Sequence, residues 1–221
     1  MPQSTNGLHS FKIHARDGEI GTLEDLYFDD GQWIVRYLVV DTGKWLPGRR
    51  VLIAPASVQT VDWSARTIQV NLTRDQVRNS PDAGADKPVS RQHEEELSAY
   101  YGWPSYWMSG SLDFEPMVFP PPPPPPEDLP AHQGNPHLRS AHAVKGYHIE
   151  ALDGPAGHVS DFMFDEATWK IVVLVVDTGS WLHHELVLLK AEAIQTISWD
   201  ERQVTVQLSR EAIKSSPALD P

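Results

Sequence analysis

The stretch LVVDTGKWL at residues 38–46 returns as LVVDTGSWL at residues 174–182, with one substitution in nine positions. Around it, residues 11–81 align with residues 147–217 at a constant offset of 136, and 28 of the 71 pairs are identical. The alignment needs no insertion or deletion. A unit of this length exceeds the roughly 20–50 residues of solenoid repeats and suffices for a small domain. The sequence therefore predicts two copies of one globular module.

Each copy is patterned as six short strands separated by turns. In the first copy the apolar, β-branched or aromatic runs are residues 11–16, 21–28, 33–40, 50–53, 58–63 and 67–72. The second copy repeats these signals. After the last run, Thr73 and Ser209 each precede a segment with an acidic first turn and a later proline, which is typical of an N-capped short helix.

We therefore expect a mainly β protein with two small β-barrels of about six strands each and short C-terminal helices. The expected boundaries are 1–85 for the first barrel domain, 86–136 for a linker rich in Trp and Pro, and 137–221 for the second barrel domain. Within the linker, residues 93–97 have a composition that suits a helix. Seven consecutive prolines at 120–126 predict a stiff polyproline II spacer of about 22 Å.

The composition excludes several classes of function. The chain has 30 acidic and 18 basic residues, a net charge of −12 and no basic run, so we expect no nucleic-acid partner. It has no Cys, which rules out disulfides, thiolate metal sites and cysteine nucleophiles. The N-terminus lacks a signal-peptide pattern, and the longest apolar run, residues 171–176, is too short to span a bilayer. We expect a soluble cytoplasmic protein with no integral membrane segment.

Both modules resemble the PRC-barrel family, named for the cytoplasmic domain of the photosynthetic reaction-centre H subunit and shared with ribosome-maturation factors. The resemblance rests on DGEIG at residues 17–21, VVDTG at 39–43 and RRVLIAP at 49–55. The second copy repeats this order but has Ala191 in place of Pro55. Together the copies cover about two thirds of the chain.

The resemblance implies a small β-barrel used for protein–protein contact, with no catalytic residues to carry over. We also expect a bacterial protein that needs no cofactor. We accordingly expect a non-enzymatic interaction or adapter module that binds an unknown protein partner or associates with itself as a homo-oligomer. An accessory role in a photosynthetic reaction-centre-like membrane complex, linked to electron transfer, is an alternative. The reaction-centre subunit has a transmembrane helix that this chain lacks, and ribosome-maturation proteins carry a different barrel before the PRC module.

A second alternative is enzymatic. Asp41-Thr42-Gly43 and Asp177-Thr178-Gly179 each follow an apolar strand, as do the paired loops of aspartic proteases, in which two carboxylates share one proton. The late strands of this chain lack the glycines that such lobes need. The structural interpretation is that each Asp binds nearby backbone amides in a turn and each Gly accepts a positive φ.

The spacing of the histidines does not indicate a metal site. His132, His137 and His142 recur at intervals of five, which places them on different faces of a helix, and His183 is followed by His184. No Cys or neighbouring carboxylate completes a tetrahedral set. We therefore predict solvated loop histidines and no metal.

Aromatic residues supply the candidate partner surface. Trp33 and Trp63 recur as Trp169 and Trp199, which indicates a role in the fold. The loop tryptophans Trp45 and Trp181 are either packed on the module or presented to a partner. The aromatic segment, residues 100–107, either docks on one module or anchors another protein. The candidate residues are Trp45, Trp181, Tyr100, Tyr101, Trp103, Tyr106 and Trp107.

Overall fold

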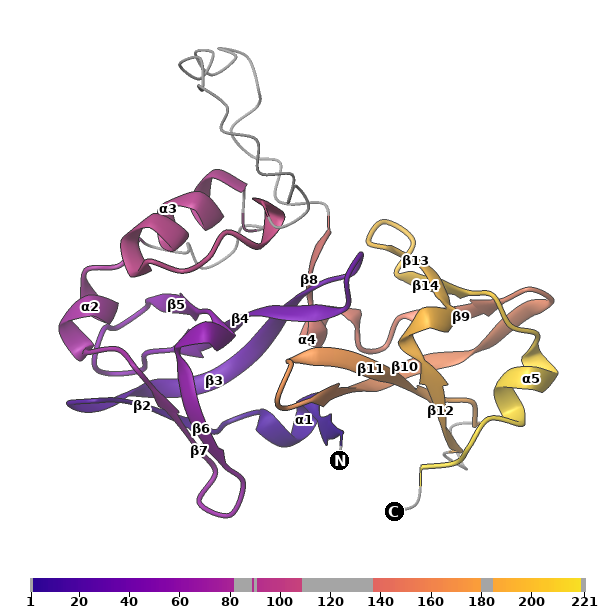
Figure 1. Cartoon of the computed structure of the whole chain (residues 1–221). Coiled ribbons are helices and arrows are strands. Elements are labelled where there is room, and N and C mark those ends of the chain that lie inside the picture. The colour runs from indigo at the N-terminus through magenta and orange to yellow at the C-terminus, as the bar shows by residue number, and fades with distance from the viewer. Residues whose placement is uncertain (1, 82–88, 90, 109–136, 180–184, 220–221) are drawn as a thin grey trace, which may run out of the picture.

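The structure is a computed structural model that describes residues 2–81, 89, 91–108, 137–179 and 185–219. Two similar sheet-rich halves lie side by side, and an extra helix covers the outside of the first half (Figure 1). The chain is mainly β, as the sequence predicts. The polyproline run, Trp181, His132, His183 and His184 lie outside the described residues.

The first half follows the predicted strand pattern closely. Its elements are β2 (Lys12–Ala15), β3 (Gly18–Asp29), β4 (Ile34–Asp41), β5 (Arg50–Ile53), the 3-10 turn η1 (Pro55–Ser57), β6 (Val58–Asp62), β7 (Thr67–Val70) and α2 (Arg74–Arg78). Successive strands β2 to β5 pair antiparallel, β6 pairs antiparallel with β7, and β7 pairs parallel with β2.

The second half repeats this pairing strand for strand. Its elements are β9 (His148–Ala151), β10 (Gly154–Asp165), β11 (Lys170–Asp177), β12 (Leu186–Lys190), the 3-10 turn η3 (Ala191–Ala193), β13 (Ile194–Ser198), β14 (Gln203–Val206) and α5 (Arg210–Lys214). Strands β9 to β12 pair antiparallel in order, β13 pairs with β14, and β14 pairs parallel with β9.

The strands form one continuous sheet in place of the two closed barrels expected from the sequence. Its order among the described residues is β13-β14-β9-β10-β11-β4-β3-β2-β7-β6, with β5 attached to β4 and β12 attached to β11. Between β5 and β6 the chain turns through η1, so the ladder of the first half does not close there. The two halves meet where Lys170 of β11 pairs with Ile34 of β4.

The short helices confirm the predicted caps. The Thr73 hydroxyl accepts a hydrogen bond from the Gln76 amide, and the Gln76 side chain accepts one from the Thr73 amide, which together form a capping box for α2. In the second half, the Ser209 hydroxyl accepts from the Ala212 amide at 3.2 Å and caps α5.

Two matched tryptophan turns join the halves. Trp33 and Trp169 both have a φ of 58°, and each carbonyl accepts a hydrogen bond from the other half. The Val35 amide donates to the Trp169 carbonyl at 2.9 Å, and the Ile171 amide donates to the Trp33 carbonyl at 2.6 Å. The indoles also stack on matched phenylalanines, Trp33 on Phe28 at 5.7 Å and Trp169 on Phe164 at 5.2 Å between ring centroids, which explains why tryptophan recurs at both positions.

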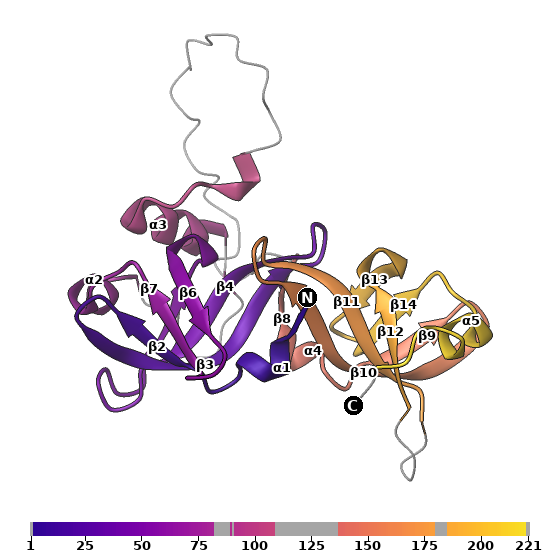
Figure 2. The same ribbon diagram turned by 60° about the horizontal axis from the view of Figure 1, so that its bottom comes forward.

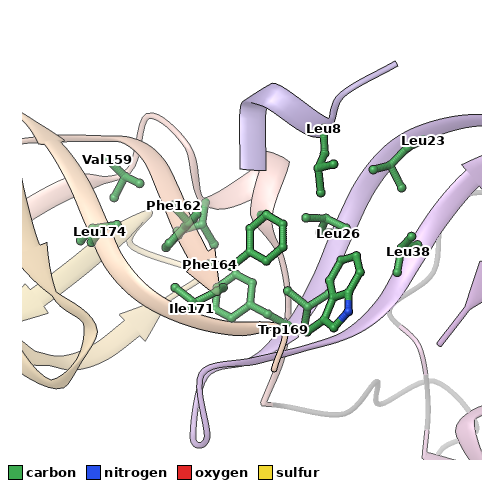
Figure 3. Packing of buried hydrophobic residues seen from close by; sticks show 14 of the residues in the cluster. Leu8, Leu23, Leu26, Leu38, Val159, Phe162, Phe164, Trp169, Ile171 and Leu174 are labelled. Atoms are coloured by element: carbon green, nitrogen blue, oxygen red, sulfur yellow. The ribbon is translucent and has the colours of Figure 1, made fainter. Parts of the chain in front are cut away.

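A single hydrophobic core crosses this junction. Phe28 of the first half lies 5.1 Å from Phe162 of the second, between ring centroids. Trp169 stacks on Phe164 at 5.2 Å and reaches toward Leu26 (Figure 3). Because the same buried cluster runs through both halves, each half depends on the other for burial of its apolar surface.

The segments that precede each half are exchanged. The N-terminal β1 (Gln3–Ser4) and α1 (Thr5–Leu8) pack on β10 of the second half, whereas β8 (Leu138–Ser140) and α4 (Ala141–Val144) pack on β3 of the first. Both short helices lie at the junction in Figures 1 and 2. The repeat therefore extends N-terminally beyond the residues that the sequence alignment identifies.

One aspartate on each long strand holds the exchanged segment. Asp161 accepts hydrogen bonds from the hydroxyls of Ser4 at 2.5 Å and Thr5 at 2.6 Å. At the matched position, Asp25 accepts from the Ser140 hydroxyl at 2.5 Å and from the His142 amide at 3.0 Å. Burial raises the pKa of Asp25, and these hydrogen bonds partly offset the increase.

Replacing Asp161 tests this exchange. Asp161→Ala removes the acceptor for the buried Thr5 hydroxyl, the half-buried Ser4 hydroxyl and the Asn6 amide, so we expect the free energy of unfolding to fall by about 2–3 kcal/mol. The matched control, Glu19→Ala, breaks only an exposed ion pair with Lys12 and is expected to cost no more than about 0.5 kcal/mol. Chemical denaturation measures both, and equal losses would contradict the proposed anchor.

The second glycine of the DGEIG motif, Gly21, is required for a steric reason. Gly21 has a φ of 155°, and a Cβ built there would lie 2.1 Å from the Asp41 carbonyl oxygen. The matched Gly157 would place a Cβ 2.2 Å from the Asp177 carbonyl oxygen. In both halves, therefore, glycine permits the start of the long strand to lie against the end of its neighbour.

Gly21→Ala is accordingly expected to lower the free energy of unfolding by about 3 kcal/mol or more, because backbone must move to accept the methyl group. Gly48→Ala is the control, since Gly48 has a φ of 76° but no atom within 4 Å of the new Cβ, and its cost is about 1–2 kcal/mol. A Gly21→Ala protein as stable as the control would show that the contact is not constraining.

Candidate interaction surface

The outer face of the first half is covered by a helix from the same chain. Helix α3 (Arg91–Tyr101) and the residues after it lie over β4 and β5 (Figure 1). A second hydrophobic cluster forms there, separate from the main core. Its buried members are Tyr37, Val39 and Leu52 from the sheet and Val89 and Leu97 from the covering segment. This outer face therefore binds an amphipathic helix.

The aromatic segment fixes the end of α3 to the sheet. Trp103 stacks on Tyr101 with ring centroids 4.2 Å apart and an interplanar angle of 17°. The Trp103 indole N–H donates to the Ser57 hydroxyl at 2.8 Å, and its backbone amide donates to the Ser98 carbonyl at 3.0 Å. The segment thus docks within the chain, which is one of the two alternatives that the sequence leaves open.

A buried carboxylate lies under α3. Glu94 is completely buried, and its Oε2 accepts hydrogen bonds from the Tyr37 hydroxyl at 3.2 Å and from the Tyr106 hydroxyl. Arg91 lies 3.5 Å from the other carboxylate oxygen. Burial and the neighbouring Glu94 raise the pKa values of both phenols, so both stay protonated and donate. This buried cluster specifies how α3 is oriented on the sheet.

Two arginines bind the aromatic rings beyond the helix. The Arg36 guanidinium lies 3.7 Å from the Tyr106 ring centroid. Arg91 lies 4.5 Å from the Trp107 ring centroid, and Trp107 packs edge-on against Tyr106 at 5.0 Å. These cation–π contacts hold the turn η2 (Tyr106–Met108) against β4.

Sequence reasoning missed this polar cluster, although a signal was present. Residues 35–40 read VRYLVV in the first copy, while residues 171–176 read IVVLVV in the second. Arg36 and Tyr37 are thus polar departures from an apolar strand. They are the two residues of β4 that contact Tyr106 and Glu94.

The remaining candidate residues that the structure describes, Tyr100 and Trp45, lie at the edge of the sheet face that α3 covers. Tyr100 is 41% exposed, and its hydroxyl donates to the Gln76 carbonyl at 2.9 Å. Trp45 is half-buried, with the guanidinium carbons of Arg74 and Arg78 at 4.7 Å and 5.7 Å from its ring centroid. Trp45 therefore packs over the end of the first half, and Trp181, its counterpart, lies outside the described residues.

In the second half, no helix of the described residues corresponds to α3 on the matching face of the sheet. Residues at the positions of Tyr37, Val39 and Leu52 are Val173, Val175 and Leu188. In this half, Val173 and Leu188 are half-buried, and Val175 is buried. The face is fully apolar at these positions, whereas the first half has the Tyr37 hydroxyl.

The two Asp-Thr-Gly turns lie at opposite ends of the molecule. Asp41 and Asp177 each accept a hydrogen bond at 2.9 Å from the amide of the glycine two residues later, as predicted for a turn. Strands β4 and β11 meet antiparallel only near Ile34 and Lys170, seven residues before each aspartate. At about 3.3 Å per residue the carboxylates are on the order of 40 Å apart, so one chain cannot place them around a shared proton.

No group of three or more potential metal ligands comes together within the described residues. The structure describes two of the histidines considered as metal ligands. His137 Nδ1 lies 3.1 Å from Asp30 Oδ1, and the backbone amide of His142 donates a hydrogen bond to the Asp25 carboxylate. Over the same part of the chain, no helix has both the length and the apolar character required to cross a bilayer.

Comparison with known families agrees with the fold of the first half. Residues 13–77, from β2 to α2, match the family model described as PRC-barrel domain. Residues 13–77 are thus similar to a PRC-barrel domain, as the sequence motifs of the first copy indicate. No curated protein matches the chain significantly.

Replacing Trp103 tests how α3 is held. Trp103→Ala removes the stacking on Tyr101 and the bond to Ser57, so we expect a loss of about 2 kcal/mol in stability and faster hydrogen exchange of the α3 amides. Trp107→Ala, which removes a cation–π contact with Arg91, is expected to cost about 0.5 kcal/mol. Unchanged exchange in Trp103→Ala would contradict this arrangement.

Proposed function

We propose that the protein is a non-enzymatic, cytoplasmic interaction module in which the second half is a second PRC-type unit. Its repeated pairing pattern and its matched tryptophan turn support this view. The conspicuous chemical groups of the described residues have structural roles. Asp41 and Asp177 form turns, and Glu94 orients a helix.

One observation carries the proposal: the sheet face formed by β4 and β5 binds a helix of its own chain. The matched face on β11 and β12 offers Val173, Val175 and Leu188 in the same strand positions. We therefore propose that this second face binds an amphipathic helix of a partner protein, with the first half showing the binding mode.

The proposed partner helix differs from α3 in one respect. In the first half the Tyr37 hydroxyl donates to a buried carboxylate on the helix. Val173 replaces Tyr37 in the second half and offers no donor. A partner helix on this face is therefore expected to present apolar side chains where α3 has Glu94, because an unpaired buried carboxylate would be costly.

Affinity purification of the tagged full-length protein from its native cells tests the proposal. The test variant carries Val173→Glu and Leu188→Glu, which place charges on the proposed face. The matched control carries Gln59→Glu and Thr60→Glu, at exposed positions of β6. We expect a stoichiometric partner that binds wild type and control but is lost from the test variant, with mass spectrometry as the readout. A partner retained by both variants, or none with wild type, would contradict it.

A further inference from the structure

The two halves differ at one pair of matched tryptophans. The Trp63 indole N–H of the first half donates to the Glu166 carboxylate of the second at 2.8 Å, and its ring packs edge-on against Phe11 at 5.2 Å. The matched Trp199 lies 6.2 Å from Tyr147 and is 44% exposed. Trp63 thus links the two halves, whereas Trp199 on the other side of the molecule packs on its own half and is partly exposed to solvent.

Two small sequence differences explain this asymmetry. A Cβ at Gly7 would lie 3.2 Å from Cζ3 of Trp63, and the matched residue on the other side is Ala143, which has that Cβ. Glu166 corresponds to Asp30, whose side chain is one methylene shorter. The tryptophan is therefore displaced outward on this side, and the carboxylate cannot reach it.

The Asp30 carboxylate interacts with Arg139 and His137, whereas the matched Glu166 carboxylate binds a tryptophan. The Asp30 carboxylate accepts a hydrogen bond from Arg139 Nε at 2.6 Å and lies 3.1 Å from His137 Nδ1. Arg139 and Asp30 are largely buried, with side chains 13% and 12% exposed. Only one of the five N–H donors of the guanidinium is used by this bond.

A cleft of about 300 Å³ lies beside this ion pair, between the turn after β3, the start of β8, and β13. This volume is at the lower end of the range for small-molecule sites. Trp33, Ile194 and Ile197 provide apolar and aromatic surface, while Asp30, His137 and Arg139 provide a polar wall.

The polar wall determines what kind of ligand would fit. The Asp30 carboxylate already interacts with Arg139 and His137, so it has little need of a further cation. The guanidinium of Arg139 retains N–H donors and positive charge, and guanidinium groups pair well with carboxylates. The opposite wall suits a flat apolar group that packs on the Trp33 side chain.

We propose that this cleft is a binding site for a small aromatic carboxylate, with the carboxylate on Arg139 and the ring between Trp33 and the isoleucines of β13. The site is independent of the proposed partner-binding face on β11 and β12. At the matched position in the other half, the Trp63 indole N–H donates a hydrogen bond to the Glu166 carboxylate.

Titration with 2-naphthoate, followed by heteronuclear NMR of the full-length protein, tests the proposal. We expect saturable shifts at Trp33, Ile194 and Ile197, and binding of 2-naphthamide weaker by on the order of tenfold, because the amide lacks the charge that Arg139 pairs with. Arg139→Gln should weaken 2-naphthoate binding by a similar factor. Arg210→Gln, an exposed arginine on α5, is the matched control and should leave it unchanged.

A second variant is designed to close the cleft without removing Arg139. Ala143→Gly combined with Asp30→Glu rebuilds the arrangement of the other half, so Trp199 should become less exposed and binding should be lost. The junction amides of Val35 and Ile171 report whether each variant remains folded. Absence of binding to wild type, equal affinity for acid and amide, or undiminished binding by the folded closed variant would overturn the proposal.

Discussion

Backbone hydrogen bonds between the two tryptophan turns, from the Val35 amide to Trp169 and from the Ile171 amide to Trp33, join two repeated units into one sheet. In each turn the tryptophan has a positive φ, a backbone conformation that costs conformational energy in a residue other than glycine. The cost is offset by burial, because Phe28 and Phe162 pack across the junction in a core that both units share. A lone unit would leave this surface exposed.

Duplication with divergence then explains where binding surfaces arise. The scaffold is repeated, whereas the residues around it differ. In the first half, Arg36 and Tyr37 orient α3 on the outer face of the sheet, and the second half has valines at both positions. Near the junction, Ala143 and Asp30 replace the glycine and glutamate of the other side and separate Trp199 from its acceptor. Small changes in side-chain volume and polarity thereby give the halves different surfaces.

Much of the fold could be predicted because its signals are local. The gapless repeat, the strand pattern and the caps at Thr73 and Ser209 all depend on short-range chemistry. The exchange of N-terminal segments could not, because a serine before a short helix does not reveal that Asp161, far along the chain, accepts its hydrogen bond. Docking of the aromatic segment within the chain is one of the two alternatives that the sequence leaves open. The burial of Glu94 is not predictable, because this residue lies within a polar helix that gives no sign of burial.

The central claim is that the two halves fold as one cooperative unit. Native-state hydrogen exchange of the full-length protein tests it most directly, with the amides of Val40 in β4 and Val176 in β11 as reporters of the two halves. The account predicts that both amides exchange only through the same global unfolding, with equal opening free energies that respond equally to denaturant. Opening of one half at a clearly lower free energy, while the other stays protected, would show two independent domains and contradict the account.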